Sequence, residues 1–449
     1  MKSGRVAPVA AALVLLAAPL AAQNRRCQLE VQNVDREGVS TSILGTSTTN
    51  YFAGGNVRLK CRGQNVRIWA DSIASYGGTL VQFIGSFRYE DESARVSSDF
   101  GTYYREAERW EARGNVHYRG VRDDSELRGP MADYLRPLRG VRELAELFAD
   151  QRPTLKLSAQ DSAGRASEPY TVVGDRIRMR GEELMWAGGS VTIDRTDLRG
   201  RSDSLQLDSG KGSAGALIGR ASIRREGADS FALAGKRIDL ALEKKELSGV
   251  TGRDSATLTS ENLDLTAATI HLRLQARKVI QTLAWGTSPR PSALADDYEV
   301  RGDSLAVDTP AEQIRELRSF RRAWVGFRPD SAKGERDWLA GDAIVASFDE
   351  VTGSKGKKSM LRRLQSEQSA SAFYRVNKAG APGGRPSINY SRADRIVLTL
   401  SGTDSLKVEK VEMTGKVDGV QLEPEARRVD TTRVRPGVRP PGPGRPDER

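Results

Sequence analysis

Residues that usually carry chemistry are scarce in this chain of 449 residues. It contains 2 Cys and 2 His, and aromatic residues make up 6% of the sequence. This supply excludes a disulfide-dense scaffold and leaves little material for a zinc site or for acid and base catalysis by histidine. We therefore expect no catalytic residues, no metal site and no cofactor, and we do not expect an enzyme.

Familiar motifs are missing as well. The sequence has no Gly-x-Ser-x-Gly elbow, no His-Glu-x-x-His, no Cys-x-x-Cys and no dinucleotide fingerprint. The formal charge of +11 would suit nucleic acid, but stacking aromatics such as Phe83 and Trp110 fall on the strand face opposite the basic side chains. We expect no nucleic-acid partner.

The chain begins with a pattern typical of export. An apolar stretch from Val6 to Leu20 follows Lys2 and Arg5, and the small residues Ala21 and Ala22 come next. This predicts a signal peptide over residues 1–22, cleaved near Gln23, and a periplasmic location. An uncleaved anchor is the alternative. In such an oxidising compartment we expect a disulfide between Cys27 and Cys61, with two free thiols as the alternative.

The apolar residues recur with a period of two. In residues 110–119, Trp110, Val116 and Tyr118 share one face, whereas Arg113 and His117 lie on the other. The same alternation recurs along most of the chain and predicts an all-β, antiparallel fold. Only residues 138–149 have helical spacing, and we expect a short helix there.

A degenerate repeat underlies the alternation. Its core is a small residue, an Asp, a spacer and an aliphatic residue, as in 70–73, 132–135, 174–177, 202–205, 302–305, 341–344 and 393–396. Glycine-rich turns such as Gly54-Gly55-Asn56 fall between copies, so each unit is predicted to be strand, Gly turn, strand, Asp turn. The expected divisions are a first β module over 23–150, a linker over 151–170, one or more degenerate modules over 171–423 and a disordered Pro/Arg-rich tail over 424–449.

The repeat resembles a known family. Gly55-Asn56-Val57 precedes Ala70-Asp71, and Gly114-Asn115-Val116 precedes Ala132-Asp133, which is similar to the A-x-G-N-V and A-D-x-x-x-Y pattern of the OstA-like (LptA-like) lipopolysaccharide-transport family. The resemblance implies a slit-like antiparallel β-jellyroll, present as two tandem modules or one extended module. It also implies an apolar interior that carries lipopolysaccharide, or a similar anionic lipid, from the inner to the outer membrane.

The resemblance further implies partners at the sheet edges: other OstA-like transport components, with head-to-tail self-association as a further expectation. Apolar residues of the predicted inner faces are the candidates for lining the lipid groove: Val57, Leu59, Val66, Ile68, Val81, Phe83, Phe87, Trp110, Val116, Tyr118, Ile177, Leu205, Leu240 and Leu272. Two alternatives stay open. One is a structural or adhesive repeat protein with a closed core, and the other is a β-helical polysaccharide lyase that uses carboxylates and Arg.

Overall fold

The computed structural model describes residues 26–423, except 37, 39, 43–48, 161–165, 211–213, 228–229, 244–245, 262, 296–297, 311–312, 328–335, 354–355, 377–385 and 402–406. The expected signal peptide (1–22) and the expected tail (424–449) therefore lie outside the described residues. Within the described part of the chain, no helix has the length and hydrophobicity that a membrane span needs.

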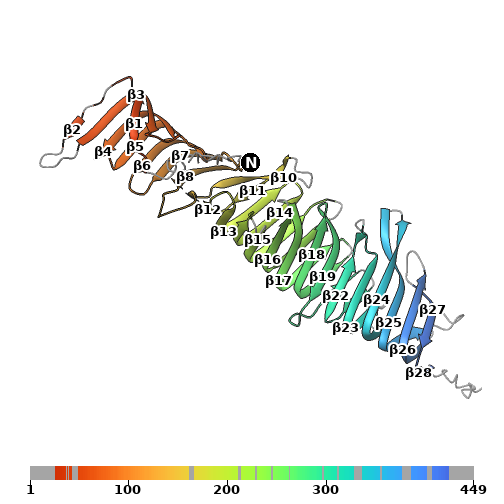
Figure 1. Ribbon diagram of the computed structural model, residues 1–449. Coiled ribbons are helices and arrows are strands. Elements are labelled where there is room, and N and C mark those ends of the chain that lie inside the picture. Colours follow the sequence, from red (N-terminus) through yellow and green to blue (C-terminus); the bar gives the residue numbers. More distant parts are fainter. Residues whose placement is uncertain are drawn as a thin grey trace, which may run out of the picture.

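The described chain is built from β-strands that succeed one another along an elongated molecule, from β1 at one end to β28 at the other (Figure 1). The strands are β1 (Leu29–Asn33), β2 (Ser40–Ser42), β3 (Thr49–Cys61), β4 (Arg67–Tyr76), β5 (Leu80–Glu90), β6 (Ala94–Tyr104), β7 (Arg109–Gly120), β8 (Glu126–Leu135), β9 (Glu146–Asp150), β10 (Thr154–Gln160), β11 (Ala166–Val173), β12 (Arg176–Arg180), β13 (Leu184–Arg195), β14 (Leu198–Asp208), β15 (Ala214–Arg225), β16 (Phe231–Glu243), β17 (Glu246–Ser260), β18 (Asp264–Gln275), β19 (Lys278–Trp285), β20 (Ser292–Leu294), β21 (Tyr298–Arg301), β22 (Ser304–Asp308), β23 (Glu316–Phe327), β24 (Trp338–Gly353), β25 (Gly356–Val376), β26 (Ser387–Ser401), β27 (Lys407–Thr414) and β28 (Asp418–Leu422).

All pairings between these strands are antiparallel, and most long strands change register once near their middle. In β7, for example, residues 109–113 pair with 131–135 of β8, and the register shifts before residues 116–119 pair with 126–129. The shift recurs from pair to pair, so the sheet is folded lengthwise along one row of corners. We call the half of the sheet that contains residues 109–113 leaf A, and the half that contains residues 116–119 leaf B.

The repeated Asp and Gly residues build these corners. Gly85 in β5 has a φ of +77°, and a Cβ at this position would collide with the carboxylate of Asp71 in β4. The next residue, Ser86, donates a hydrogen bond of 3.1 Å from Oγ to Asp71 Oδ2. Gly114 lies against Asp99 in the same way, so one glycine and one carboxylate on adjacent strands form each of these corners.

The expected unit of strand, Gly turn, strand, Asp turn is therefore wrong. Gly54-Gly55-Asn56 lies inside β3, and Asp71 lies inside β4. Two successive residues with positive φ, such as Gly55 and Asn56, form a bulge that bends the strand without ending it. Because pairing resumes beyond the bulge, the period of two continues through the corner.

The expected helix over 138–149 is also wrong. A tight turn containing Gly140, with a φ of +77°, occupies its first part, and residues 146–150 form β9 between β8 and β12. Leu147 and Ala149 of β9 are buried, whereas Asp150 is exposed. Pairing on both sides fixes this segment as a strand, which overrides its short helical spacing.

Much of the segment expected to be a linker, residues 151–170, lies in the sheet. β9 and β10 act as one bent strand, with its corner at Gln151 and Arg152, both at positive φ. β11 and β12 repeat this arrangement across Gly174 and Asp175. Hydrogen bonds thus continue on both leaves from β8 to β13.

The apolar faces of leaves A and B form a single core that runs the length of the sheet. Alternate residues of most strands point into it, as the burial of every second residue of β12 shows. The fold is all-β and antiparallel, as the sequence predicts. The space between the leaves is the place where a lipid groove would lie.

Candidate functional site: the interior between the two leaves

In the N-terminal region, β3 to β8, aromatic side chains fill the interior. The ring of Trp110 on leaf A lies with its centroid 4.6 Å from that of Tyr89 on leaf B and 4.2 Å from that of Tyr103. Tyr118 and Tyr134 meet across the leaves at 6.1 Å. Trp110 is 1% exposed. Such pairs add stabilisation beyond the area they bury, so this part of the interior is a packed core.

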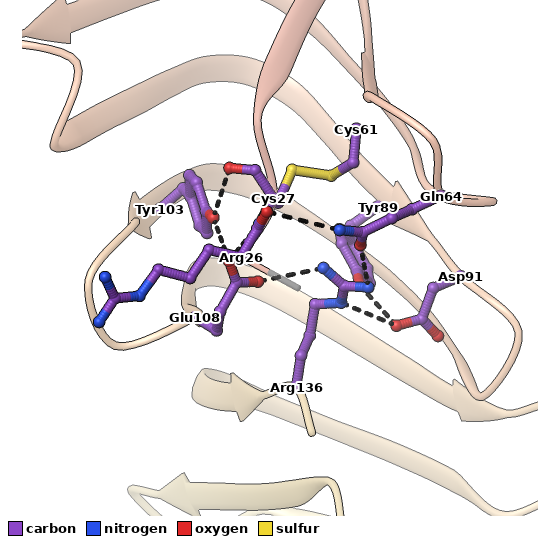
Figure 2. Close-up of a disulfide and its surroundings, with 9 residues drawn as sticks. All are labelled: Arg26, Cys27, Cys61, Gln64, Tyr89, Asp91, Tyr103, Glu108 and Arg136. Atoms are coloured by element: carbon purple, nitrogen blue, oxygen red, sulfur yellow. Dashed lines mark hydrogen bonds and ion pairs between the residues drawn. A yellow bond between two sulfur atoms is a disulfide. The ribbon is translucent and has the colours of Figure 1, made fainter. Parts of the chain in front are cut away.

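A buried polar network joins the free margins of the two leaves in the same region (Figure 2). Glu108 and Arg136 lie at the margin of leaf A, with Arg136 Nη1 3.0 Å from Glu108 Oε2. Arg136 also reaches leaf B, where Nη2 donates to Gln64 Oε1 at 2.8 Å. The Cys27 backbone N–H of leaf B donates to Glu108. This network closes the side of the slit opposite the corners.

Two further contacts flank the network, one within leaf B and one between the leaves. Cys27, just before β1, forms a disulfide with Cys61 at the end of β3. At the other end of the network, Asp91 in the β5–β6 turn of leaf B accepts hydrogen bonds from the hydroxyls of Tyr89 (2.6 Å) and Tyr134 (3.1 Å). Burial raises the pKa of both tyrosines well above the ordinary phenol value, and the charge of Asp91 adds to the rise. Both phenols are therefore neutral donors at neutral pH.

In the middle region, β10 to β17, the interior is aliphatic and is not filled. A cavity of about 120 Å³ lies between the leaves there. Leaf A lines it with Leu205, Leu207 and Leu240, and leaf B with Val172 and Ile193. Leu207 and Leu240 are only partly buried. Most of the lining is aliphatic, with Ser158, Tyr170 and Ser209 as uncharged polar residues, and such a wall suits an acyl chain.

The mouth of this cavity is polar. Asp123 and Ser125 of the β7–β8 turn lie on the leaf B side, and Glu182 of the β12–β13 turn lies on the leaf A side. A larger cleft of about 880 Å³ adjoins the mouth and shares Asp123 and Glu182 with the cavity. We call this cleft the vestibule. It lies directly beside the polar network, because Gln64, Asp91 and Arg136 also line it.

The groove candidates named from the sequence fall into three groups in the structure: the cavity, the vestibule and the core. Only Leu205 and Leu240 line the aliphatic cavity, and Val66 and Tyr118 reach the vestibule. The remaining candidates lie buried in the core outside the cavity lining: Val57, Leu59, Ile68, Val81, Phe83, Phe87, Trp110, Val116, Ile177 and Leu272. Most of the candidates thus belong to the N-terminal region, where the polar network closes the margins of the two leaves.

Other residues of the site escaped the sequence reasoning. Leu157, Leu207 and Leu247 line the cavity, and their alternation with polar neighbours could have marked them. The local sequence does not distinguish Glu108 and Arg136 of the network, because charged residues are common in the turns between strands. Among the described residues, no group of three or more His, Cys, Asp and Glu side chains is placed to hold a metal ion.

The two ends of the sheet are open. At the C-terminal end, β27 and β28 form the last strand, and each pairs only with β26 among the described strands. Val417, Val420 and Leu422 are more than half exposed there. At the N-terminal end, β1 and β2 pair only with β3 in the described part of the chain.

No family model and no curated protein sequence matches the chain. Among solved structures, it is similar to the crystal structure of LptH, the LptA homologous periplasmic component of the lipopolysaccharide transport device from Pseudomonas aeruginosa. The identity is 15%, the TM-score is 0.25, and the match covers 29% of this chain and 96% of that one.

Proposed function

We propose that this chain is an exported, non-enzymatic carrier that holds the acyl chains of lipopolysaccharide, or of a similar amphiphile, between its two leaves on the way from the inner to the outer membrane. One observation carries the proposal: the aliphatic cavity between β10 and β17, which opens at a polar mouth. An amphiphile requires this combination of an apolar wall and a polar exit. The Gly-Asn-Val and Ala-Asp motifs of the OstA-like pattern support the same function.

The energetics suit transient binding. Each CH₂ group that leaves water contributes about 0.8 kcal/mol, so a few methylene groups per chain hold the lipid in place. The cavity walls offer no charge that would fix one position along the slit. Within the middle region, an amphiphile could then move from one strand to the next without a large barrier.

The open ends of the sheet complete the proposal. Unpaired backbone groups on β28 and on β1 are templates for adding a strand from another chain. We propose that other β-jellyroll transport components, or further copies of this chain, dock there. The continuous hydrogen bonding through β9 to β12 favours one extended module over two separate ones.

Photo-crosslinking tests the carrier function. A benzoylphenylalanine at Leu207 or Leu240 should capture lipopolysaccharide in cells that make it. The matched control is Gln206, an exposed neighbour of Leu207 on the outer face. A second control is Phe83, which is 1% exposed in the closed region.

Capture at Leu207 and Leu240 alone supports the carrier. Absence of lipid at all positions, together with no lipid in mass spectra of the purified protein, would favour the competing reading of a structural repeat protein. The closed N-terminal core is the specific observation that favours this second function.

A further inference from the structure

The blocked N-terminal interior raises the question of where an amphiphile would enter. Trp110, Tyr89 and Tyr134 fill the space between the leaves, and the network of Glu108 and Arg136 seals their margins. A chain of methylene groups has no room to pass along the axis through this region. Entry from the N-terminal end is therefore closed in this conformation.

Immediately beyond the polar network, the free margins of leaves A and B separate. The vestibule lies between the turns of leaf B at 63–66, 91–93 and 122–123 and the segments of leaf A at 136–137, 143–145 and 180–184. It meets the aliphatic cavity at Asp123 and Glu182. The vestibule thus leads from solvent to the apolar walls at the side of the molecule.

One ion pair spans this opening. Arg122 of leaf B lies with Nη1 3.4 Å from Glu182 Oε1 of leaf A. Both side chains are exposed, at 64% and 46%, so the pair is weak and can open. It differs from the sealed pair of Glu108 and Arg136, whose side chains are 1% and 10% exposed.

The charges of the vestibule indicate the class of headgroup. Its basic residues are Arg122, Arg136 and Arg180, and each lies near a carboxylate: Glu182, Glu108 and Glu146, respectively. Acidic residues outnumber them in the lining: Asp91, Glu92, Asp123, Glu143, Glu182 and Glu183. A bare phosphate would meet a net negative surface. Sugar hydroxyls, which both donate and accept, suit a mixed lining of carboxylates and guanidinium groups.

We propose that the side opening between Arg122 and Glu182 is the portal through which a glycolipid enters the slit, with its sugar in the vestibule and its acyl chain in the cavity. The Arg122–Glu182 pair acts as the latch of this portal. This inference rests on the proposed carrier function and adds the entry route and the headgroup class.

Stopped-flow binding of n-dodecyl-β-maltoside, below its micelle concentration, tests the portal. The full mature chain carries a bimane on Leu240→Cys, and its own disulfide remains oxidised. Arg122→Glu places like charges across the opening and should raise the entry and exit rates roughly two- to fivefold, the range expected for an exposed pair. The double variant Arg122→Glu/Glu182→Arg should restore the original rates.

The matched control is Arg220→Glu. Arg220 pairs at 2.6 Å with Asp203, and both side chains are exposed, but this pair lies on the row of corners. Its loss should leave the rates unchanged. If Arg122→Glu binds at the same rate as the unmodified latch and as Arg220→Glu, the portal is overturned, whereas the carrier function stands. If maltoside binds to none of these proteins, the carrier function falls as well.

Dodecyl phosphate, with the same chain, tests the headgroup. We expect it to bind several-fold more weakly than the maltoside, because the vestibule lining is net acidic. Equal or tighter binding of the phosphate would overturn the assignment of a sugar to the vestibule.

Discussion

The N-terminal region (β3 to β8) and the middle region (β10 to β17) share the same corners but have different interiors. At the corners, Asn115 donates to Asp99 at 2.8 Å in the first region, and Arg220 donates to Asp203 at 2.6 Å in the second. Inside, Trp110 and its tyrosine neighbours fill the first, whereas leucines surround a cavity in the second. The outer construction of a folded sheet therefore does not determine whether its interior is a core or a slit.

The difference has an energetic cost. The aliphatic side chains that line the cavity of about 120 Å³ lack packing partners on the side that faces it, so they lose the dispersion contacts that a filled core provides. A region kept only for stability has no reason to retain such a void. The aromatic region shows that the same fold can be filled.

The largest expected loss of stability tests whether the margins of the N-terminal region are closed. Arg136→Ala leaves the buried carboxylate of Glu108 without its cation, and this should destabilise the N-terminal region by roughly 3–5 kcal/mol. Hydrogen exchange measured by mass spectrometry should show faster exchange in β5 to β8 and little change in β13 to β17. Arg220→Ala is the control, since its exposed pair should contribute no more than about 1 kcal/mol. Equal destabilisation by the two variants would contradict the claim that the polar network closes the margins of the N-terminal region.

The disulfide should have the next largest effect. Cys27 and Cys61 are 34 residues apart, and closing a loop of this length contributes about 2–4 kcal/mol. The double variant Cys27→Ala/Cys61→Ala should lower the free energy of unfolding of the N-terminal region, measured by urea titration, by that amount. Lipid capture at Leu240 should persist in this variant. Loss of capture would mean that the two regions are not independent.

Introducing a phenylalanine into each region should have opposite results. Val116→Phe adds volume to the packed N-terminal core and should destabilise it by ~1–3 kcal/mol. Leu207→Phe places its added volume at the cavity, so it should be neutral or stabilising and should reduce binding of dodecyl maltoside. Thermal unfolding and the bimane signal measure the two effects. Similar destabilisation by both variants would show that the middle region is packed as well.

Tyr134 should make the smallest contribution to stability at neutral pH. It should also affect how stability changes at alkaline pH. Its hydroxyl bond to Asp91 contributes about 0.5–1.5 kcal/mol, which Tyr134→Phe removes. The folded-state pKa is raised by burial, so an unfolded phenol ionises first as pH rises above ~10. The unfolded state then holds fewer protons, and stability falls with rising pH.

Tyr134→Phe should therefore weaken the dependence of stability on pH above ~10. Urea midpoints measured between neutral and alkaline pH check this prediction. A variant that lost stability with rising pH as steeply as the unmodified chain would show that Tyr134 does not contribute to this titration.

The sequence supports the all-β fold directly, because the period of two that separates Trp110 and Val116 from Arg113 and His117 continues across the corners. It does not place the corners. Gly55 and Asp71 are typical turn residues, and only the pairing of β3 with β4 shows that they bend strands instead of ending them. The short helical spacing around Leu144 was misleading for a similar reason, since pairing with β8 and β12 decides that segment.

The site was less accessible to prediction. Alternation identifies Phe83 and Leu205 equally as inward-facing, but it says nothing about what stands opposite on the other leaf. Whether the interior is filled depends on the summed volume of side chains far apart in sequence, as with Tyr89 and Trp110. A shift from aromatic to leucine-rich inner faces between β8 and β13 was a visible signal. The ion pair of Glu108 and Arg136 could not be predicted from the sequence, because it depends on the strand register that brings the two turns together.

The central claim is that the slit is open in the middle region and closed in the N-terminal region. Methyl NMR of the chain from residue 23 onward, with a doxyl-labelled alkyl maltoside, tests it most directly. The account predicts strong paramagnetic broadening of the methyl groups of Leu205, Leu207 and Leu240, and none for Leu59 or Ile68 beyond that of an exposed reference, Leu422. Equal broadening of Leu59 and Leu240, or no broadening of Leu240, would contradict it.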